Sequence, residues 1–304
     1  MTNSESATIN LQIDNDKPKT LYLRNNIDSK ILKENLIKSN KVLIVGGGFI
    51  GLEIASSAKQ LGKEVHLIEM GNQLMGRSIP KNISNHIKIV HENKGNNIYL
   101  NTTINDVSFN QSNIKVTLSN NKKIDVDLII VGIGSIPNTK IFEQSELELD
   151  NGIVTDEFSQ TSIEDVYAAG DVTNFYHPFY KKNIRLESYR HAQNHGISAG
   201  KNIVGERVPY AEIPWMWSDQ YNLNLQLTGI CNDYDTCIKR GDNINEGIIY
   251  FFLKNMHIIG ACGVGISGKI GRDIRLAGIL SKRRIKVKKE ILEDKNQKLN
   301  KILT

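Results

Sequence analysis

A glycine-rich turn between a strand and a helix, within Lys41–Met70, constrains the fold of this chain more than any other feature. The run Val42–Val45 is short, apolar and β-branched, which predicts a buried parallel strand. Three glycines follow with the spacing G-x-G-x-x-G: Gly46, Gly48 and Gly51. The first allows a tight turn, the second lets a pyrophosphate approach the backbone, and the third lets a helix pack on the strand. The spacing predicts a dinucleotide-binding βαβ unit.

The residues that follow complete this unit. A helix is expected from about Ile50 to Leu61, and its first N–H groups and positive dipole end face the phosphate site. A second strand, Glu64–Ile68, ends in Glu69, about 20 residues after the glycines, where a carboxylate holds the adenine ribose hydroxyls. The alternative is a tight turn in another kind of α/β protein, but strand, turn, helix, strand and acid all occur here in order.

The acid also bears on cofactor choice. A carboxylate at Glu69 repels the 2′-phosphate of NADP, which favours NAD. Arg77 lies a few residues further on, and its guanidinium would soften that preference.

Length and composition set outer bounds. The 304 residues are enough for two or three domains, and contents of 39% hydrophobic and 23% charged residues are ordinary for a soluble globular protein. No apolar run approaches the length of a membrane span, and the polar start is no signal peptide, so a cytoplasmic location is expected. The net charge of +5 owes much to the tail from Ser281 onward, which fits an acidic protein partner or nucleic acid, although a solvated face is the preferred interpretation. No nucleic-acid-binding motif accompanies the tail.

The remaining elements are short. A strand over Thr20–Arg24 and a helix over Ile27–Ile37 precede the glycine unit, and a helix with one apolar side follows it within residues 72–95. Further strands are expected over Asn97–Leu100, Ile114–Leu118, Ile124–Val126 and Asp127–Val131. The last strand ends at Gly132, at the edge where open α/β sheets bind ligands.

A second candidate site lies further along the chain. A strand in Asp165–Val172 is expected to run into Gly170 and Asp171, before an amphipathic helix over Glu187–Val204. An acid behind a glycine at a strand end can bond ribose- or ribitol-type hydroxyls. It can equally cap its own backbone in a turn, and the residues alone leave both open.

Several motifs together resemble one family. GGGFIGLE with the Glu69 spacing, VGIGSIPN, YAAGDV, RLESYRHAQ and PWMWSDQY are similar to the FAD-dependent pyridine nucleotide reductases, of the ferredoxin, rubredoxin and putidaredoxin reductase type that serves oxygenase systems. The resemblance covers nearly the whole chain from Leu21. It implies an α/β fold with an NAD-binding Rossmann-like domain inserted in an FAD-binding domain, followed by a small α+β domain. On that pattern residues 1–40 are a residual FAD-domain segment and linker helix, 41–126 the NAD-binding domain, 127–205 the second half of the FAD-binding domain, and 206–304 the C-terminal reductase domain.

The resemblance also implies roles for single residues. Asp171, behind Gly170, bonds the FAD ribitol chain, the backbone at Tyr189 meets the flavin ring, and Trp217 sits beside it. Glu53 matches a carboxylate near the nicotinamide and the flavin, so Glu53 and Trp217 are the expected catalytic residues. The remaining cofactor-contact positions are Gly46, Gly48, Phe49, Ile50, Gly51, Glu69, Arg77 and Gly132.

The chain departs from the family pattern at its start. Family members begin with their own strand–GxGxxG–helix unit, which grips the ADP part of FAD, and the chain is expected to lack this N-terminal FAD-binding half. The lysine that pairs with Glu53 would lie there too. A separate polypeptide that supplies this half, a truncated gene and a misplaced start are all open explanations. This chain alone is expected to bind NAD measurably and FAD poorly, and to self-associate.

Other motifs compete for attention. Gly263, Gly265 and Gly268 repeat the glycine spacing without a following strand and acid, so a strand-to-helix loop is the preferred interpretation. His191 and His195 share a helix face, where two partly exposed histidines are preferred to a metal site, and no metal is expected. Trp215 and Trp217 share one face of a strand, which without the resemblance favours core aromatics and with it favours a place at the flavin for Trp217. Leu223, Leu225 and Leu227 indicate a half-buried strand.

The cysteines help to separate reaction types. Cys231, Cys237 and Cys262 form no C-x-x-C, and residues 41–126 hold no cysteine, which argues against a thioredoxin-reductase-like dithiol. The function expected is that of a flavoprotein oxidoreductase, which passes electrons from NADH through FAD to a ferredoxin- or rubredoxin-like acceptor. The alternatives are a non-catalytic NAD-binding remnant and a relative of monodehydroascorbate or nitrite reductases.

Overall fold

The structure is a computed structural model that describes residues 4–9, 20–109 and 113–302. Much of the polar start, expected to be patternless, lies outside these ranges. The chain divides into two compact units. One, here called the nucleotide unit, contains Ser6–Ser135 and Ser218–Leu225. The other, here called the C-terminal unit, contains Ile136–Trp217, the chain from Gln226 onward and the N-terminal residues through Glu5. The expected four-part division of the chain stays a prediction.

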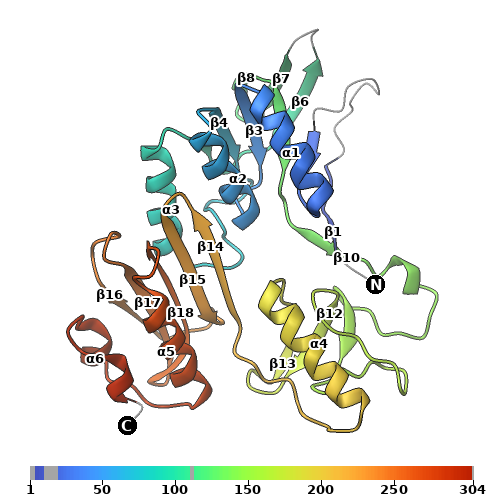
Figure 1. Ribbon diagram of the computed structural model, residues 1–304, viewed down its shortest axis with the longest axis vertical. Coiled ribbons are helices and arrows are strands. Elements are labelled where there is room, and N and C mark those ends of the chain that lie inside the picture. The colour runs from blue at the N-terminus through green and yellow to red at the C-terminus, as the bar shows by residue number, and fades with distance from the viewer. Residues whose placement is uncertain (1–3, 10–19, 110–112, 303–304) are drawn as a thin grey trace. The chain divides into compact units, whose positions relative to one another are not determined.

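A five-stranded parallel sheet forms the centre of the nucleotide unit (Figure 1). In spatial order its strands are β2 (Thr20–Tyr22), β9 (Leu128–Val131), β3 (Lys41–Val45), β4 (Glu64–Ile68) and β5 (Asn97–Tyr99). The helices are α1 (Asn26–Lys38), α2 (Phe49–Gln60) and α3 (Lys81–Asn93). The expected strands and helices are therefore confirmed to within a few residues, and the Rossmann-like order is present.

Both faces of this sheet are covered, which explains why its strands read as continuous apolar runs. On one face Leu43 and Val45 join a core with a three-stranded antiparallel sheet of β6 (Ile104–Phe109), β7 (Ile114–Leu118) and β8 (Lys123–Val126). On the other face Ile44 lies against α2. Strand β6 was not predicted, because half of its residues are exposed and it has no clean alternation of buried and exposed positions.

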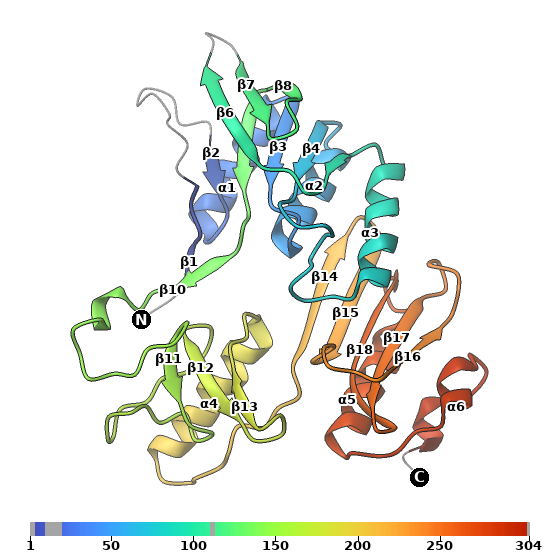
Figure 2. The same ribbon diagram turned by 180° about the vertical axis from the view of Figure 1, so that it is seen from behind.

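The C-terminal unit contains one whole sheet and most of a second, whose residues Ser218–Leu225 belong to the nucleotide unit. The first, in the order β11-β12-β13, consists of β11 (Ile153–Thr155), β12 (Thr173–His177) and β13 (Lys182–Ile184) and precedes helix α4 (Tyr189–Ile203). The second has the order β14-β15-β18-β17-β16 and is shown in Figure 2. Its strands are β14 (Trp215–Gln220), β15 (Leu223–Gly229), β16 (Thr236–Arg240), β17 (Ile248–Lys254) and β18 (His257–Ile266). Two short strands, β1 (Ser4–Ser6) and β10 (Ser135–Pro137), pair separately, and a 3-10 turn covers Lys140–Phe142.

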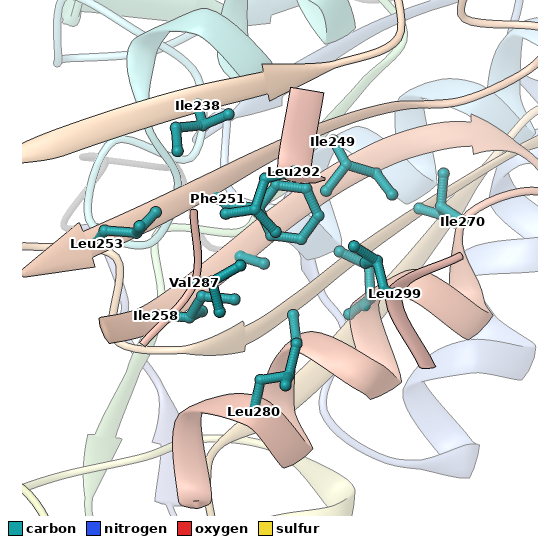
Figure 3. Packing of buried hydrophobic residues seen from close by; sticks show 13 residues of the cluster. Ile238, Ile249, Phe251, Leu253, Ile258, Ile270, Leu280, Val287, Leu292 and Leu299 are labelled. Carbon is teal, nitrogen blue, oxygen red and sulfur yellow. The ribbon is translucent and has the colours of Figure 1, made fainter. Parts of the chain in front are cut away.

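Phe251 lies at the centre of the core beneath the second sheet (Figure 3). Helices α5 (Gly271–Lys282) and α6 (Lys289–Glu293) and a final 3-10 turn, Leu299–Ile302, contribute residues to it. The basic tail is therefore packed structure rather than only a charged face, since Val287, Leu292 and Leu299 are buried among the sheet residues.

A buried arginine fixes this tail to the sheet. Arg240, at the end of β16, forms an ion pair with Asp273 at 3.1 Å. Its guanidinium also donates to the main-chain carbonyls of Ile291, Leu292, Asp294, Lys295 and Gln297. These charge-assisted bonds satisfy carbonyls that would otherwise need water.

Three expectations need correction. The strand expected to run into Gly170 instead follows it, as β12, because the preceding residues turn and make only an isolated bridge at Tyr167. Gly263 and Gly265 lie inside β18 rather than in a loop, where a Cβ would come within 3.0 Å of the neighbouring strand or loop backbone. Strand β15 is not half-buried, because Asn224 and Thr228 are buried along with its leucines.

Candidate functional site

The glycine turn of the nucleotide unit is tightly packed on its inner side. Gly46 has a φ of +105°, and a Cβ there would lie within 3.0 Å of the carbonyl oxygen of Gly132. A Cβ on Gly51 would lie within 3.0 Å of the carbonyl oxygen of Gly46. Both positions therefore require glycine, and Gly132 is brought to the turn by the pairing of β9 with β3.

The outer side of the same turn is open. A Cβ on Gly48 would meet only the Gly132 carbonyl oxygen, at 3.9 Å. Gly48 is the N-cap of α2, and no side chain caps the helix there. The first N–H groups of α2, from Phe49 and Ile50 onward, are thus free of side-chain caps beside an uncrowded backbone, which is the arrangement that a phosphate group requires.

Glu69 holds the turn from the neighbouring strand. Its Oε2 accepts from the backbone N–H of Gly47 at 2.7 Å, and its Oε1 accepts from the N–H of Gly71 at 2.7 Å. Each carboxylate oxygen has a further lone pair, so Glu69 can also accept from ribose hydroxyls. Arg77 lies at a second glycine loop, Gly132–Gly134, which follows β9. Its guanidinium donates to the Ile133 carbonyl at 3.1 Å and approaches Gly134.

Replacing Glu69 by alanine is expected to lower NAD affinity by roughly ten- to a hundredfold, which corresponds to about 1.5–3 kcal/mol for a charged hydrogen-bond acceptor. The preference for NAD over NADP should also shrink, because the repulsion of a 2′-phosphate is lost. Titration calorimetry with both nucleotides measures the two effects. Unchanged affinities for both would show that Glu69 does not contact the ribose.

Glu53 lies on the second turn of α2, is half-buried, and contacts strand β14. Ser218 donates its hydroxyl to Glu53 Oε1 at 2.6 Å. The pKa of Glu53 is raised, mainly because burial penalises the carboxylate, while the hydrogen bond from Ser218 opposes that shift. Nothing in the spacing of the sequence pointed to Ser218, although it directly follows Trp217, a predicted site residue.

The C-terminal unit brings together the other predicted residues. Gly170, with a φ of +86°, lies against Ala192 in the first turn of α4, the helix that begins at Tyr189. The guanidinium of Arg190 lies 5.3 Å from the ring centroid of Trp215, which in turn stacks on Trp217 at 5.1 Å. Asp171 follows Gly170 in the same loop. Tyr189 is 73% exposed and Trp217 is 41% exposed, so two aromatic side chains of this unit are open for contact with a ring system.

The prediction that the two histidines of α4 are partly exposed is wrong. His191 and His195 are 4% and 0% exposed, and both pack against Phe175. His195 Nδ1 accepts from the backbone N–H of Gly170 at 3.2 Å, so this histidine supports the Gly170 loop. His191 Nδ1 contacts the Tyr210 hydroxyl at 3.2 Å. Among the described residues no group of three or more His, Cys, Asp or Glu side chains is arranged to hold a metal ion.

The cysteines do not form a redox pair in this structure. Cys231 and Cys262 are buried and Cys237 is exposed, all as free thiols. Burial raises the pKa of Cys231 to about 12, which keeps it protonated. In the described part of the chain, none of the helices has the length and apolar character needed to cross a membrane.

The parallel sheet, the glycine turn and the acid at the end of β4 define a dinucleotide-binding oxidoreductase fold. The chain belongs to the pyridine nucleotide-disulphide oxidoreductase family, whose pattern matches residues 5–196, and residues 215–303 match the reductase C-terminal family. With the relatives named below, these matches identify it as a member of the ferredoxin reductase type.

Known proteins resemble the chain over most of its length. The ferredoxin–NAD(+) reductase component of an anthranilate 1,2-dioxygenase system from Burkholderia cepacia is 32% identical over 84% of this chain and 63% of its own. A rubredoxin–NAD(+) reductase from Ectopseudomonas oleovorans is 34% identical over 71% of this chain and 57% of its own. The chain thus spans less than two thirds of the length of these relatives.

Solved structures agree with the fold. The ferredoxin reductase for the CYP199A2 system of Rhodopseudomonas palustris aligns with a TM-score of 0.90 at 26% identity, over 99% of this chain and 74% of its own. The reductase in a covalent putidaredoxin reductase–putidaredoxin complex aligns with a TM-score of 0.91 at 26% identity, over 99% of this chain and 72% of its own.

Proposed function

We propose that this chain carries the NADH-binding and acceptor-facing parts of a flavoprotein reductase, which passes electrons from NADH through FAD to a ferredoxin- or rubredoxin-like protein. The observation that carries the proposal is the joint presence of an open glycine turn with Glu69 and a reductase C-terminal segment that contains Trp217. The printed names of the relatives, which are reductases of ferredoxin, rubredoxin and putidaredoxin, support the acceptor class.

In this proposal the nucleotide unit holds NADH. The uncapped N–H groups at the start of α2 bind the pyrophosphate, and the free lone pairs of Glu69 accept from the adenine ribose. Arg77 and the backbone at Gly132 border the same site from the second glycine loop. Glu53, one turn further along α2, is placed beside the nicotinamide. The choice of NAD over NADP rests on the negative charge of Glu69.

The C-terminal unit contributes to the flavin site. Asp171 bonds the ribitol hydroxyls, the backbone at Tyr189 faces the ring, and Trp217 lies beside it. His195 fixes the loop that carries Asp171 through its bond to Gly170. When bound, FAD supplies the chemistry that accepts a hydride and releases single electrons, while the protein supplies binding, orientation and electrostatics.

The proposal is tested with the full chain, supplied with NADH, FAD and a polypeptide that carries the N-terminal FAD-binding segment of a relative. Calorimetry measures NADH binding, and dye reduction, followed by reduction of a rubredoxin or a [2Fe–2S] ferredoxin, measures electron transfer. We expect NADH-dependent reduction of the dye that depends on added FAD and falls when Asp171 is replaced by alanine. Tight NADH binding without any reduction of the dye would instead identify a non-catalytic NAD-binding protein.

A further inference from the structure

A network of hydrogen-bonded side chains runs from Glu53 into the interior of the nucleotide unit. Ser218 and Gln220 alternate along β14, so they share one face of the strand, and Gln220 Nε2 donates to Ser218 Oγ at 3.1 Å. Gln220 Oε1 lies 3.0 Å from His91 Nε2 on α3, and His91 Nδ1 lies 3.0 Å from Asn96 Nδ2. Ser218, Gln220 and His91 are each no more than 2% exposed.

The donors in this network all point toward Glu53. The Ser218 hydroxyl has one proton, which it donates to Glu53, so its oxygen is the acceptor for Gln220. The amide oxygen of Gln220 can only accept, so His91 must carry its proton on Nε2. His91 Nδ1 is then the acceptor for the amide of Asn96. With His91 neutral, every one of these hydrogen bonds has one donor and one acceptor.

The turn between β14 and β15 is held in place beside this network. Tyr221 has a φ of +57°, an unfavourable conformation for a bulky residue, which persists only where the surroundings stabilise it. Its N–H donates to Ser56 Oγ at 2.6 Å and its hydroxyl accepts from Asn96 Nδ2 at 2.5 Å. The Tyr221 ring also packs edge-on against His91 at 5.1 Å. The side chains of this network thus have little freedom to reorient.

We propose that His91 is a positioning residue for Glu53. Through Gln220 and Ser218 it keeps a hydroxyl donor directed at the Glu53 carboxylate. The site then binds the cationic oxidised nicotinamide more tightly than the neutral reduced one. This inference rests on the proposed placement of Glu53 beside the nicotinamide. A carboxylate attracts the positive charge of NAD⁺ and has no such interaction with NADH. ADP-ribose, which lacks the nicotinamide, depends only on the glycine turn and Glu69.

The test compares the affinities of NAD⁺, NADH and ADP-ribose by calorimetry with the full chain. We expect His91→Phe to weaken NAD⁺ binding about three- to tenfold, the effect of one hydrogen bond, while NADH and ADP-ribose change less than about twofold. His91→Gln should restore NAD⁺ affinity, because its amide nitrogen corresponds to Nε2 and can donate to Gln220. His91→Asn should not, because its amide is too short to reach. Ser84→Ala is the matched control, because Ser84 is buried on α3 but takes no part in these hydrogen bonds.

Glu53→Gln separates the two proposals. It should weaken NAD⁺ binding alone, and adding His91→Phe to it should have no further effect. If Glu53→Gln leaves NAD⁺ affinity unchanged, the placement of Glu53 fails and the inference fails with it. If Glu53→Gln acts but His91→Phe does not, or if His91→Phe weakens ADP-ribose equally, only the role of His91 is overturned. In the unmodified chain, a ¹⁵N spectrum that shows the His91 proton on Nδ1 would also overturn it.

Discussion

Replacing Gly51 by alanine is expected to lower NAD affinity by roughly a hundredfold and to destabilise the nucleotide unit by about 1–3 kcal/mol. A methyl group at this position would lie within 3.0 Å of the Gly46 carbonyl oxygen and 3.5 Å from Ile44 Cγ2. Neither the turn nor β3 can move away, because Gly46 is itself packed against Gly132. The start of α2 must therefore shift, and its N–H groups no longer meet the pyrophosphate. Calorimetry with NAD and chemical denaturation measure the two effects.

A second glycine in a helix provides the control. In α4 a Cβ added to Gly196 would meet nothing within 4 Å. Gly196→Ala should therefore stabilise the protein by about 0.5–1 kcal/mol through helix propensity, without a change in NAD affinity. If both variants bind NAD as the unmodified chain does, the close contact between α2 and the glycine turn is not needed for binding.

The protein is expected to lose about 4 kcal/mol of stability between pH 7 and pH 5 because of His191 and His195, about 2 kcal/mol from each. Burial lowers the pKa of His191 from 6.5 to about 4 and that of His195 from 6.5 to about 3. Between these values and 6.5 the unfolded chain binds more protons than the folded one, so stability rises with pH in that window. It is lost as the pH falls below about 6.5.

Urea denaturation at several pH values tests this prediction. The double variant His191→Asn, His195→Gln should show a much smaller slope of stability against pH, whatever its stability at pH 7. Gly196→Ala, on the same helix, removes no titratable group, so it is the control and should keep the original slope. The remaining slope is attributed mainly to His66, His91 and His177, whose pKa values burial also lowers. A double variant with the unmodified slope would mean that the two histidines do not stay neutral in the folded protein.

The sequence by itself determined the nucleotide fold, because its determinants are local. The β-branched run before Gly46, the glycine spacing and the acid at Glu69 lie within a single βαβ unit, and the structure has each element within a few residues of its expected place. The motif resemblance likewise led to the family. Local signals were weaker after Val131, where the strand expected before Gly170 turned out to follow it.

Only the tertiary structure decided which distant residues meet. Contacts between Glu53 and Ser218, or between His91 and Gln220, join positions more than a hundred residues apart, and no periodicity encodes such pairs. The burial of His191 and His195 was hidden for a related reason. Helical spacing shows that two residues share a face, but the aromatic side chain that covers this face, Phe175, comes from another element. Glu69 likewise seemed free for the ribose, yet hydrogen bonds from two backbone N–H groups also make it a support of the turn.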